Sequence, residues 1–303
     1  MKKILILGVN SYIGNSFQKY MEENYPGEFE IARVSLRNDA WKEADWAEYD
    51  SILNVTGKAH ADIGSLTEEE KQEYYAVNCD LACEAARKAI EDGVAQYIYL
   101  SSVIVYGDSS NDGGAVHITK DTKPAPSNFY GDSKWQAEQK LRTLFDESAT
   151  DDGKNNTSLA IIRPPMIYGK NSKGNFKMLV KLADRTPIFP NVKNERSMLY
   201  VENLAEFLRL LIDSRKAGLF LPQNDSYVTT AQMVSAIAEA KGKKLLLCGW
   251  MNPLVALAKK MSGKIGGMAG KAFGSMTIEQ ELSRKEIDGY QRFGLKESVE
   301  RSV

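Results

Sequence analysis

The sequence predicts an α/β protein built on a doubly wound, mostly parallel sheet. Short apolar runs such as residues 4–7 and 97–100 are typical of strands that are covered on both faces. Longer helical patterns, such as residues 68–90, alternate with these runs, and this alternation favours βαβ units. With 303 residues, the chain can form one large domain or two domains that share an interface.

The composition excludes several classes of protein. Apolar residues make up 43% and charged residues 26%, a balance typical of soluble globular proteins. The net charge of −1 favours neither a nucleic acid nor an acidic membrane as partner. Three cysteines cannot form a disulfide framework, and with only two histidines we expect no metal site. No signal peptide precedes the strand at 4–7, so we expect a cytoplasmic protein.

The first strand leads directly into a glycine turn and then a helix. Residues 4–7 form the strand, Gly8 follows, and residues 15–24 have a helical pattern. Glycine allows a tight turn, and the free N–H groups at a helix N-terminus bind a pyrophosphate. The opening of the chain therefore predicts a dinucleotide-binding unit.

The second strand is expected at residues 29–34. In NAD-binding proteins its end carries an acidic residue that binds the adenosine ribose. Here Ser35, Leu36 and Arg37 follow the strand. Arg37 is either a solvated residue of a surface turn or, with Ser35, part of a pocket for a 2′-phosphate. A longer strand would give the acidic role to Asp39.

A third segment carries groups that can move a proton. The strand at 97–100 ends at Ser101 and Ser102, at the edge of the sheet where ligands bind in open α/β folds. Tyr130 and Lys134 lie four residues apart, so they share one face of a helix. An ammonium favours the phenolate and is expected to lower the pKa of the tyrosine. Such a tyrosine can exchange a proton with an alcohol oxygen that the serine also holds.

The order of these segments resembles the extended short-chain dehydrogenase/reductases, the family of nucleotide-sugar epimerases, dehydratases and 4-keto reductases. The resemblance spans nearly the whole chain and is weak beyond Trp250. It rests on a strand, Ser101-Ser102, Val105-Tyr106-Gly107, a loop with two prolines, and Tyr130-x-x-x-Lys134. It implies that Ser102, Tyr130 and Lys134 are catalytic.

The resemblance also implies an organisation into two parts. We expect a Rossmann-type, NAD(P)-binding domain over residues 1–164 and a small, discontinuous C-terminal substrate lobe over residues 165–303. The helix at 201–214 is expected to return to the core. A homodimer is implied as well.

The expected cofactor is NADP(H) or NAD(H). The family uses Gly-x-x-Gly-x-x-Gly, and this chain keeps the first and third glycines but has Ser11 at the second, where a Cβ crowds the phosphate or demands a shifted turn. The expected cofactor-binding residues are Gly8, Asn10, Ser11, Tyr12, Ile13, Gly14, Ser35, Arg37, Val55, Thr56, Gly57, Asn78, Tyr130 and Lys134.

By the same resemblance, the substrate is a nucleotide-linked hexose that reacts at C4. Ser102, Tyr130, Asn175 and Arg196 are the expected substrate-binding residues, and a guanidinium suits a diphosphate. A 4-keto reductase and a 4-epimerase use the same catalytic residues, and we leave both open, with a preference for the reductase. Alternatives are a non-catalytic dinucleotide-binding regulator and a small-alcohol or steroid-type dehydrogenase of the same fold.

Two further segments are distinguished by their composition. Residues 108–114 form a polar insertion that could cover the sugar site. Residues 251–276 combine apolar side chains, lysines and glycines, and they form either an amphipathic segment touching a membrane or a helix pair of the substrate lobe. We favour the helix pair and therefore predict no membrane partner.

Overall fold

The computed structural model describes residues 1–59, 66–108, 115–150, 157–261 and 263–303. The chain forms two compact units. Unit 1 comprises Met1–Gly107, Pro124–Pro164 and Leu204–Leu221, and unit 2 comprises Asp108–Lys123, Pro165–Asn203 and Pro222–Val303. The functional division into domains 1–164 and 165–303 stays a prediction.

Unit 1 contains a six-stranded sheet in which every neighbouring pair of strands is parallel. Its order is β10-β6-β4-β3-β1-β2. The strands are β1 (Lys2–Leu7), β2 (Phe29–Val34), β3 (Ser51–Asn54), β4 (Gln96–Leu100), β6 (Ser158–Ile162) and β10 (Gly218–Phe220). The winding reverses at β1, so the carboxyl ends of β1 and β3 flank the position where such sheets bind ligands. The predicted fold class is confirmed.

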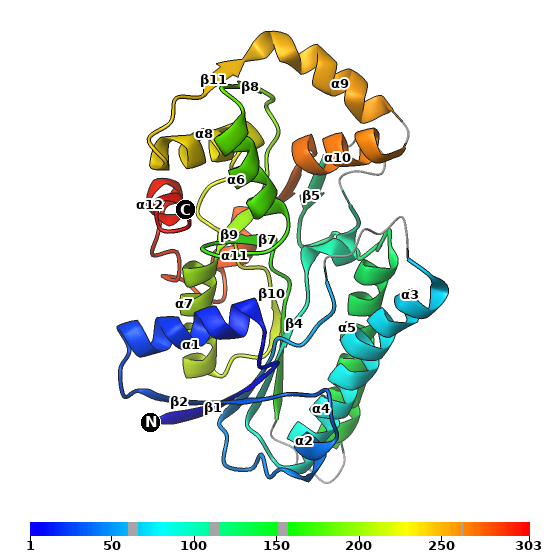
Figure 1. The fold of residues 1–303 in the computed structure, drawn as a ribbon. Coiled ribbons are helices and arrows are strands. Elements are labelled where there is room, and N and C mark those ends of the chain that lie inside the picture. Colours follow the sequence, from blue (N-terminus) through cyan, green and yellow to red (C-terminus); the bar gives the residue numbers. More distant parts are fainter. Residues whose placement is uncertain (60–65, 109–114, 151–156, 262) are drawn as a thin grey trace. The chain divides into compact units, whose positions relative to one another are not determined.

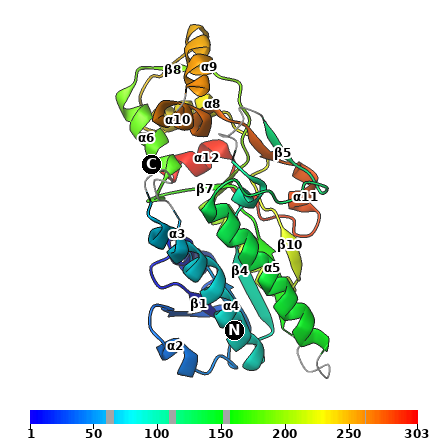
Figure 2. The ribbon, with the colours of Figure 1, turned by 90° about the vertical axis from the view of Figure 1, so that its right-hand side faces the viewer.

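Helices cover both faces of this sheet. They are α1 (Tyr12–Asn24), α2 (Ala40–Glu43), α3 (Glu68–Tyr75), the π-helix η1 (Ala76–Asp80), α4 (Leu81–Glu91), the 3₁₀-helix η2 (Val103–Tyr106), α5 (Phe129–Thr150) and most of α7 (Val201–Ser214). Figure 1 shows α1 and α7 on one face and α4 and α5 on the other, and in Figure 2 α3, α4 and α5 lie side by side. Leu5, Leu7, Tyr97 and Tyr99 point into the apolar core under α4 and α5.

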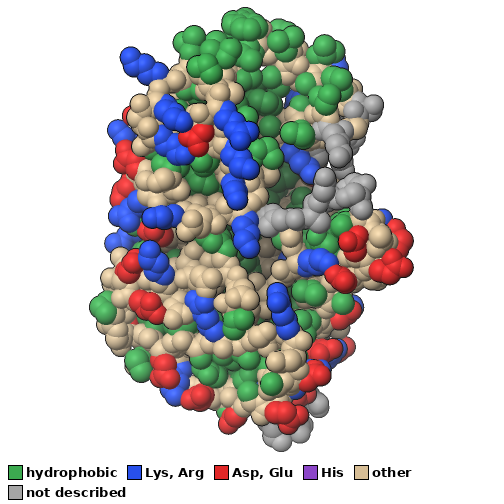
Figure 3. Space-filling model, in the orientation of Figure 1, with side chains coloured by type: hydrophobic (Ala, Val, Ile, Leu, Met, Phe, Trp, Pro, Cys, Tyr) green, Lys and Arg blue, Asp and Glu red, His purple; other side chains and the backbone are tan. Residues whose placement is uncertain are grey.

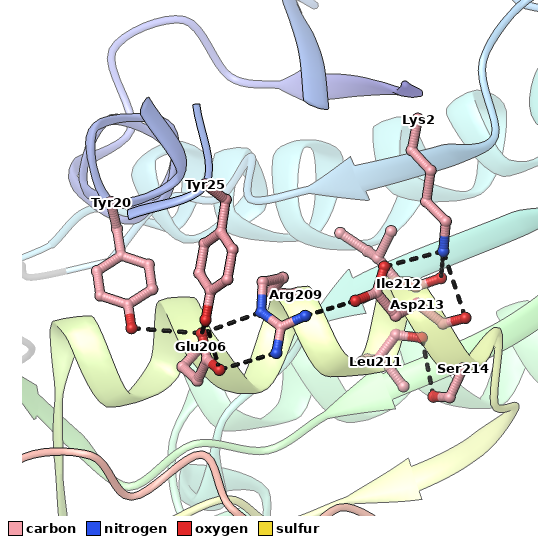
Figure 4. Close-up of polar contacts among 9 residues, drawn as sticks. All are labelled: Lys2, Tyr20, Tyr25, Glu206, Arg209, Leu211, Ile212, Asp213 and Ser214. Atoms are coloured by element: carbon pink, nitrogen blue, oxygen red, sulfur yellow. Dashed lines mark hydrogen bonds and ion pairs between the residues drawn. The ribbon is translucent and has the colours of Figure 1, made fainter. Parts of the chain in front are cut away.

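Polar contacts tie α7 to the first βα unit (Figure 4). The carboxylate of Glu206 is buried, accepts a hydrogen bond from the Tyr25 hydroxyl at 2.9 Å and pairs with Arg209. Lys2 donates to the carboxylate of Asp213 at 2.9 Å. Residues 204–214 are therefore part of unit 1 through these contacts as well as through the apolar face of the helix.

Unit 2 contains three two-stranded parallel sheets. The pairs are β7 (Met166–Tyr168) with β9 (Met198–Tyr200), β8 (Ile188–Pro190) with β11 (Leu246–Cys248), and β5 (Val116–Ile118) with β12 (Met276–Ile278). Its helices are α6 (Asn175–Arg185), α8 (Thr230–Ala240), η3 (Gly249–Met251), α9 (Asn252–Lys260), α10 (Gly263–Phe273), α11 (Gln280–Arg284) and α12 (Leu295–Glu300). Within the described ranges, no helix is both long enough and apolar enough to span a membrane.

Candidate active site

The structure brings the side chains of Ser102 and Tyr130 close together. Ser102 follows β4 and caps η2, where its hydroxyl accepts from the amide of Ile104 at 3.3 Å. Tyr130 stands in the first turn of α5. Burial raises the pKa of Tyr130 to about 12, while the nearby Ser102 hydroxyl lowers it in part. At neutral pH the tyrosine is therefore protonated and can act as an acid.

Lys134 lies one turn further along α5 and is almost fully buried. Its ammonium donates to the carbonyl oxygen of Leu100 at 2.9 Å and lies 4.7 Å from the ring centre of Tyr99. Burial lowers the pKa of Lys134 to about 8, against the raising effect of Glu138. The expected lowering of the pKa of Tyr130 by Lys134 is not found, since burial, Ser102 and Tyr74 are the groups and effects that shift this pKa.

The side chain of Asn78 connects the turn after β3 to α5 by hydrogen bonds. It stands in the π-helix η1, a rare widening of a helix that is often found at functional sites. Its side-chain oxygen accepts from the amide of Lys58 at 2.8 Å, and its nitrogen donates to Lys58 and to Ser133. A Cβ at Gly57 would lie 3.2 Å from Nζ of Lys134 and 3.3 Å from Oδ1 of Asn78. The turn, Asn78 and Lys134 thus form one closely packed group.

The glycine turn after β1 is compatible with a dinucleotide. Gly8 has φ +115, a conformation that favours glycine, and its amide donates to the Val34 carbonyl at 2.9 Å. Ser11, at the family's second glycine position, is the N-cap of α1 and accepts from the amide of Gly14 at 3.3 Å. The serine therefore has a structural role in starting the helix. Asn10 is exposed, and Tyr12 and Ile13 begin α1.

Two further observations fit a ligand at this edge. A Cβ at Gly14 would lie 2.9 Å from Ile6 and 3.3 Å from Val55, so the glycine lets α1 approach the strands. The hydroxyl of Thr56 is buried and has no hydrogen-bond partner among the described residues, and a Cβ at Gly8 would lie 3.3 Å from it. A buried hydroxyl of this kind is expected to find a partner when a ligand binds.

At the end of β2, the structure places an arginine at the glycine turn that was not among the expected site residues. Ser35 accepts from the amide of Arg37 at 3.3 Å, and the Arg37 side chain is exposed. The arginine that reaches the glycine turn is Arg33, which sequence reasoning missed. Its guanidinium donates to the carbonyls of Val9 at 3.3 Å and Gly14 at 3.2 Å. A charged residue inside an otherwise mostly apolar strand was the available signal.

A buried network beneath the site was also missed. Ser101 donates to Glu138 at 2.5 Å, and Arg163 pairs with the same carboxylate at 2.6 Å. Arg163 also donates to the Tyr106 hydroxyl at 2.5 Å. The network fixes the segment that carries Ser102 against α5. Glu138 lies four residues after Lys134, so the spacing Tyr-x-x-x-Lys-x-x-x-Glu was the available signal.

The expected substrate residues Asn175 and Arg196 belong to unit 2. Asn175 is the first residue of α6 and is exposed. Arg196 donates to the carbonyl of Lys271, and burial lowers its pKa, partly offset by Asp108. Their roles stay predictions, and residues 109–114 of the polar insertion lie outside the described residues. In the described part of the chain, no three His, Cys, Asp or Glu side chains gather as metal ligands.

Comparison with known proteins assigns the class. The family model described as "RmlD substrate binding domain" matches residues 1–256, so the chain belongs to this family. A UDP-glucose 4-epimerase of Vibrio cholerae is 32% identical over 244 residues, which are 79% of this chain and 70% of that protein.

Two more similarities extend over longer parts of the chain. The N-acetyl-alpha-D-glucosaminyl-diphospho-ditrans,octacis-undecaprenol 4-epimerase of Escherichia coli O157:H7 is 24% identical over 307 residues, 94% of this chain and 87% of that protein. The structure of a dTDP-4-dehydrorhamnose reductase from Bacillus anthracis in complex with NADP has a TM-score of 0.70 at 19% identity, covering 99% of this chain and 98% of that one. At this identity the structure supports the fold alone.

Proposed function

We propose that the protein is an NAD(P)-dependent oxidoreductase acting at C4 of a nucleotide-linked hexose, as a 4-epimerase or a 4-keto reductase. The observation that carries the proposal is the proximity of Ser102 to Tyr130, with Lys134 one turn away on the same helix. Three groups of these types can hold and protonate a single sugar oxygen. The names of the curated relatives support the same position on the sugar.

The cofactor would be held at the carboxyl ends of β1 and β3. When bound, a nicotinamide dinucleotide supplies hydride acceptance and return. The N-terminus of α1 and the turn at Gly8–Gly14 would bind its pyrophosphate. Thr56, Gly57 and Lys134 would face its nicotinamide half, and Ser35 and Arg37 its adenosine half.

The chain's own residues would then move one proton at the sugar. Ser102 holds O4 of the hexose by a hydrogen bond. In the direction of reduction, Tyr130 donates its proton to O4, which fits a phenol with a pKa of about 12. In the direction of oxidation, Tyr130 must accept that proton, and we expect the Lys134 ammonium, one turn away on α5, to stabilise the charge that forms during the reaction.

Of the two reactions, the curated relatives support epimerisation, whereas the absence of an acidic residue at Ser35–Arg37 supports an exchangeable NADP(H) and hence reduction. An epimerase retains its cofactor through each turnover, and a reductase consumes one reduced cofactor per product. A regulator without catalysis would turn over neither kind of substrate. A small-alcohol dehydrogenase would act without a diphosphate.

The test is a substrate panel followed by ¹H NMR. The purified protein is incubated with UDP-glucose, UDP-N-acetylglucosamine and a dTDP-4-keto-6-deoxyhexose, each with and without added NAD(P)H. We expect a product altered at C4 with at least one of them. Conversion without added cofactor identifies an epimerase, and conversion that needs NAD(P)H identifies a reductase. Turnover of unlinked alcohols alone would overturn the proposal.

A further inference from the structure

Unit 2 presents an apolar surface formed by α9, α10 and the segment before them. We call it the α9–α10 surface. It consists of Trp250, Leu254, Leu257, Met261, Ile265 and Met268, whose exposed fractions run from 47% for Met261 to 68% for Trp250. In Figure 3 hydrophobic side chains gather over α9 and β11, at the top of the view. Contiguous apolar surface of this kind usually marks an interaction site.

Helix α9 turns its apolar side chains outward. None of its nine residues is buried. Leu254 and Leu257 lie three residues apart, on one face, and are 57% and 63% exposed. Helices in proteins are normally stabilised by burying such a face. Helices of this composition usually bury their leucines against a partner. Within the described residues, no partner buries Leu254 and Leu257.

The helix pair is nevertheless closely packed. α9 contacts α10, and a Cβ at Gly266 would lie 1.7 Å from the carbonyl oxygen of Met261. Only a glycine allows α10 to approach the end of α9 so closely. Ile265 and Met268 are again three residues apart and are exposed. The surface is thus held in place by backbone packing, with its large apolar side chains left free.

The charge of this region has one sign. Residues 241–278 contain no aspartate or glutamate, although the whole chain has a net charge of −1. Lysines are the charged residues there, namely Lys241, Lys243, Lys244, Lys259, Lys260, Lys264 and Lys271. Lys241 and Lys243 pair with Asp184, so we assign the positive charge of this surface to the other lysines. A second copy of the chain, docked by the same surface, would bring lysines against lysines. An anionic partner complements them.

We propose that the α9–α10 surface docks onto the face of a bilayer that contains anionic phospholipids. Apolar side chains from helices that lie on a membrane insert into the boundary between headgroups and acyl chains, and lysines beside them bind anionic headgroups. The combination of Trp250, two leucines and only positive charge matches this mode of binding. The helices lie on the membrane and do not span it.

The docking itself does not depend on the reaction. The experiment below measures binding without catalysis, so its outcome is independent of whether the proposed reaction occurs.

The test uses the full chain and lipid vesicles. Co-sedimentation is measured with vesicles of phosphatidylcholine containing phosphatidylglycerol and with vesicles of phosphatidylcholine alone. We expect binding to the anionic vesicles, weakened by added salt. Trp250 is exposed, whereas Trp41 and Trp46 are buried and Trp135 is half-buried. The tryptophan emission is therefore expected to shift to the blue on binding, and Trp250→Phe removes most of that shift.

Two variants and a control make the test specific. Leu254→Glu/Leu257→Glu is expected to lower the affinity for anionic vesicles by a factor of about 10 or more, because charge replaces inserted apolar side chains. Lys259→Ala/Lys260→Ala is expected to lower it about fivefold per lysine. The control Met178→Glu/Leu219→Glu changes two exposed apolar residues elsewhere and leaves binding unchanged.

Three results would overturn the proposal. One is the absence of co-sedimentation with anionic vesicles. Another is equal binding by the wild type and by Leu254→Glu/Leu257→Glu, with the fold of both checked by circular dichroism. The third is a dimer in solution that this double variant, and not the control, converts to monomer. That result would assign the surface to a second copy of the chain.

Discussion

The ammonium of Lys134 donates to the carbonyl oxygen of Leu100 at 2.9 Å, and thereby joins α5 to the strand that ends at the Ser101-Ser102 pair. The lysine is 4% exposed, and burial lowers its pKa from 10.5 to about 8. The folded state therefore binds this proton less tightly than the unfolded state does. This buried charge is expected to lower the stability of the fold.

We predict that Lys134→Met stabilises the fold while it abolishes turnover. The pKa shift corresponds to roughly 3 kcal/mol of destabilisation at and below pH 8. The lost hydrogen bond to Leu100 offsets about 1 kcal/mol of the gain. The net gain of about 2 kcal/mol should decline as the pH rises from about 8 toward 10.5, where the unfolded lysine also loses its proton.

Urea unfolding at pH 7 and at pH 10 measures this difference. Lys140→Met is the matched control, since Lys140 lies on the same helix and pairs with Asp80 at the surface. A Lys134→Met variant that is less stable than the wild type at pH 7 would show that the ammonium is well solvated or paired in the fold.

Tyr130→Phe is predicted to reduce turnover by ~10²-fold or more, because the acid and base that serves O4 is removed. Binding of the cofactor should change little. Tyr75→Phe is the control, since the hydroxyl of Tyr75 bonds Asp132 at 2.8 Å, away from Ser102. Initial rates on the substrate identified by NMR measure both. Wild-type turnover in the Phe variant would mean that another group moves the proton.

Gly14→Ala is predicted to destabilise the fold by about 1–3 kcal/mol, because its Cβ would lie 2.9 Å from the side chain of Ile6. Gly267→Ala is the control, because no atom lies within 4 Å of a Cβ there. In a helix that substitution should be neutral or stabilising. Thermal unfolding of the two variants tests the prediction. Equal stabilities would mean that α1 can shift from β1 without loss.

We predict that NADP(H) is accepted and preferred over NAD(H). Ser35 does not repel a 2′-phosphate, and the exposed Arg37 guanidinium can bind its oxygens. Arg37→Ala should weaken NADP(H) binding about tenfold and leave NAD(H) binding unchanged. Arg33→Ala should weaken both, because Arg33 bonds the carbonyls of the glycine turn. Tighter NAD⁺ binding that is insensitive to Arg37→Ala would refute the pocket and favour the epimerase.

We also predict that the protein is not a 4,6-dehydratase. That reaction needs an additional acid and base near C5 and C6 of the sugar. Members of the related family that perform it carry an Asp-Glu pair after the serine or threonine of this strand. Here Val103, Ile104 and Val105 follow Ser102 and form η2. Steady formation of a 4-keto-6-deoxy product from dTDP-glucose, detected by mass spectrometry, would contradict this prediction.

Local patterns in the sequence predicted the main features of unit 1. The apolar runs locate the buried strands, and the four-residue spacing places Tyr130 and Lys134 on one face. The π-helix at Asn78 was not predicted, nor were the side-chain bonds of Asn78 with Lys58 and Ser133, which lie 20 and 55 residues away in the sequence. Helix propensity and hydrophobic periodicity describe the local sequence and contain no information on such long-range contacts.

Charge averaged over the chain does not show how charge is distributed along it. The net charge of −1 gave no reason to expect an acidic membrane as partner, and the absence of a membrane partner stays a prediction, although residues 241–278 contain lysines and no acidic residue. Their significance depends on the exposure of Leu254 and Leu257, which the sequence alone does not establish. The same apolar side chains are compatible with a buried helix pair, which was the preferred interpretation of the sequence.

The proposed function requires that Tyr130 take part in chemistry at C4 of a diphosphate-linked hexose. Wild type and Tyr130→Phe are compared by ¹H NMR on the same substrate panel, after titration shows that both bind the cofactor equally. We predict that the wild type alters the configuration or oxidation state at C4 of at least one substrate and that Tyr130→Phe is slower by ~10²-fold or more. No change at C4 with any substrate, or equal rates in the two proteins, would contradict the proposed function.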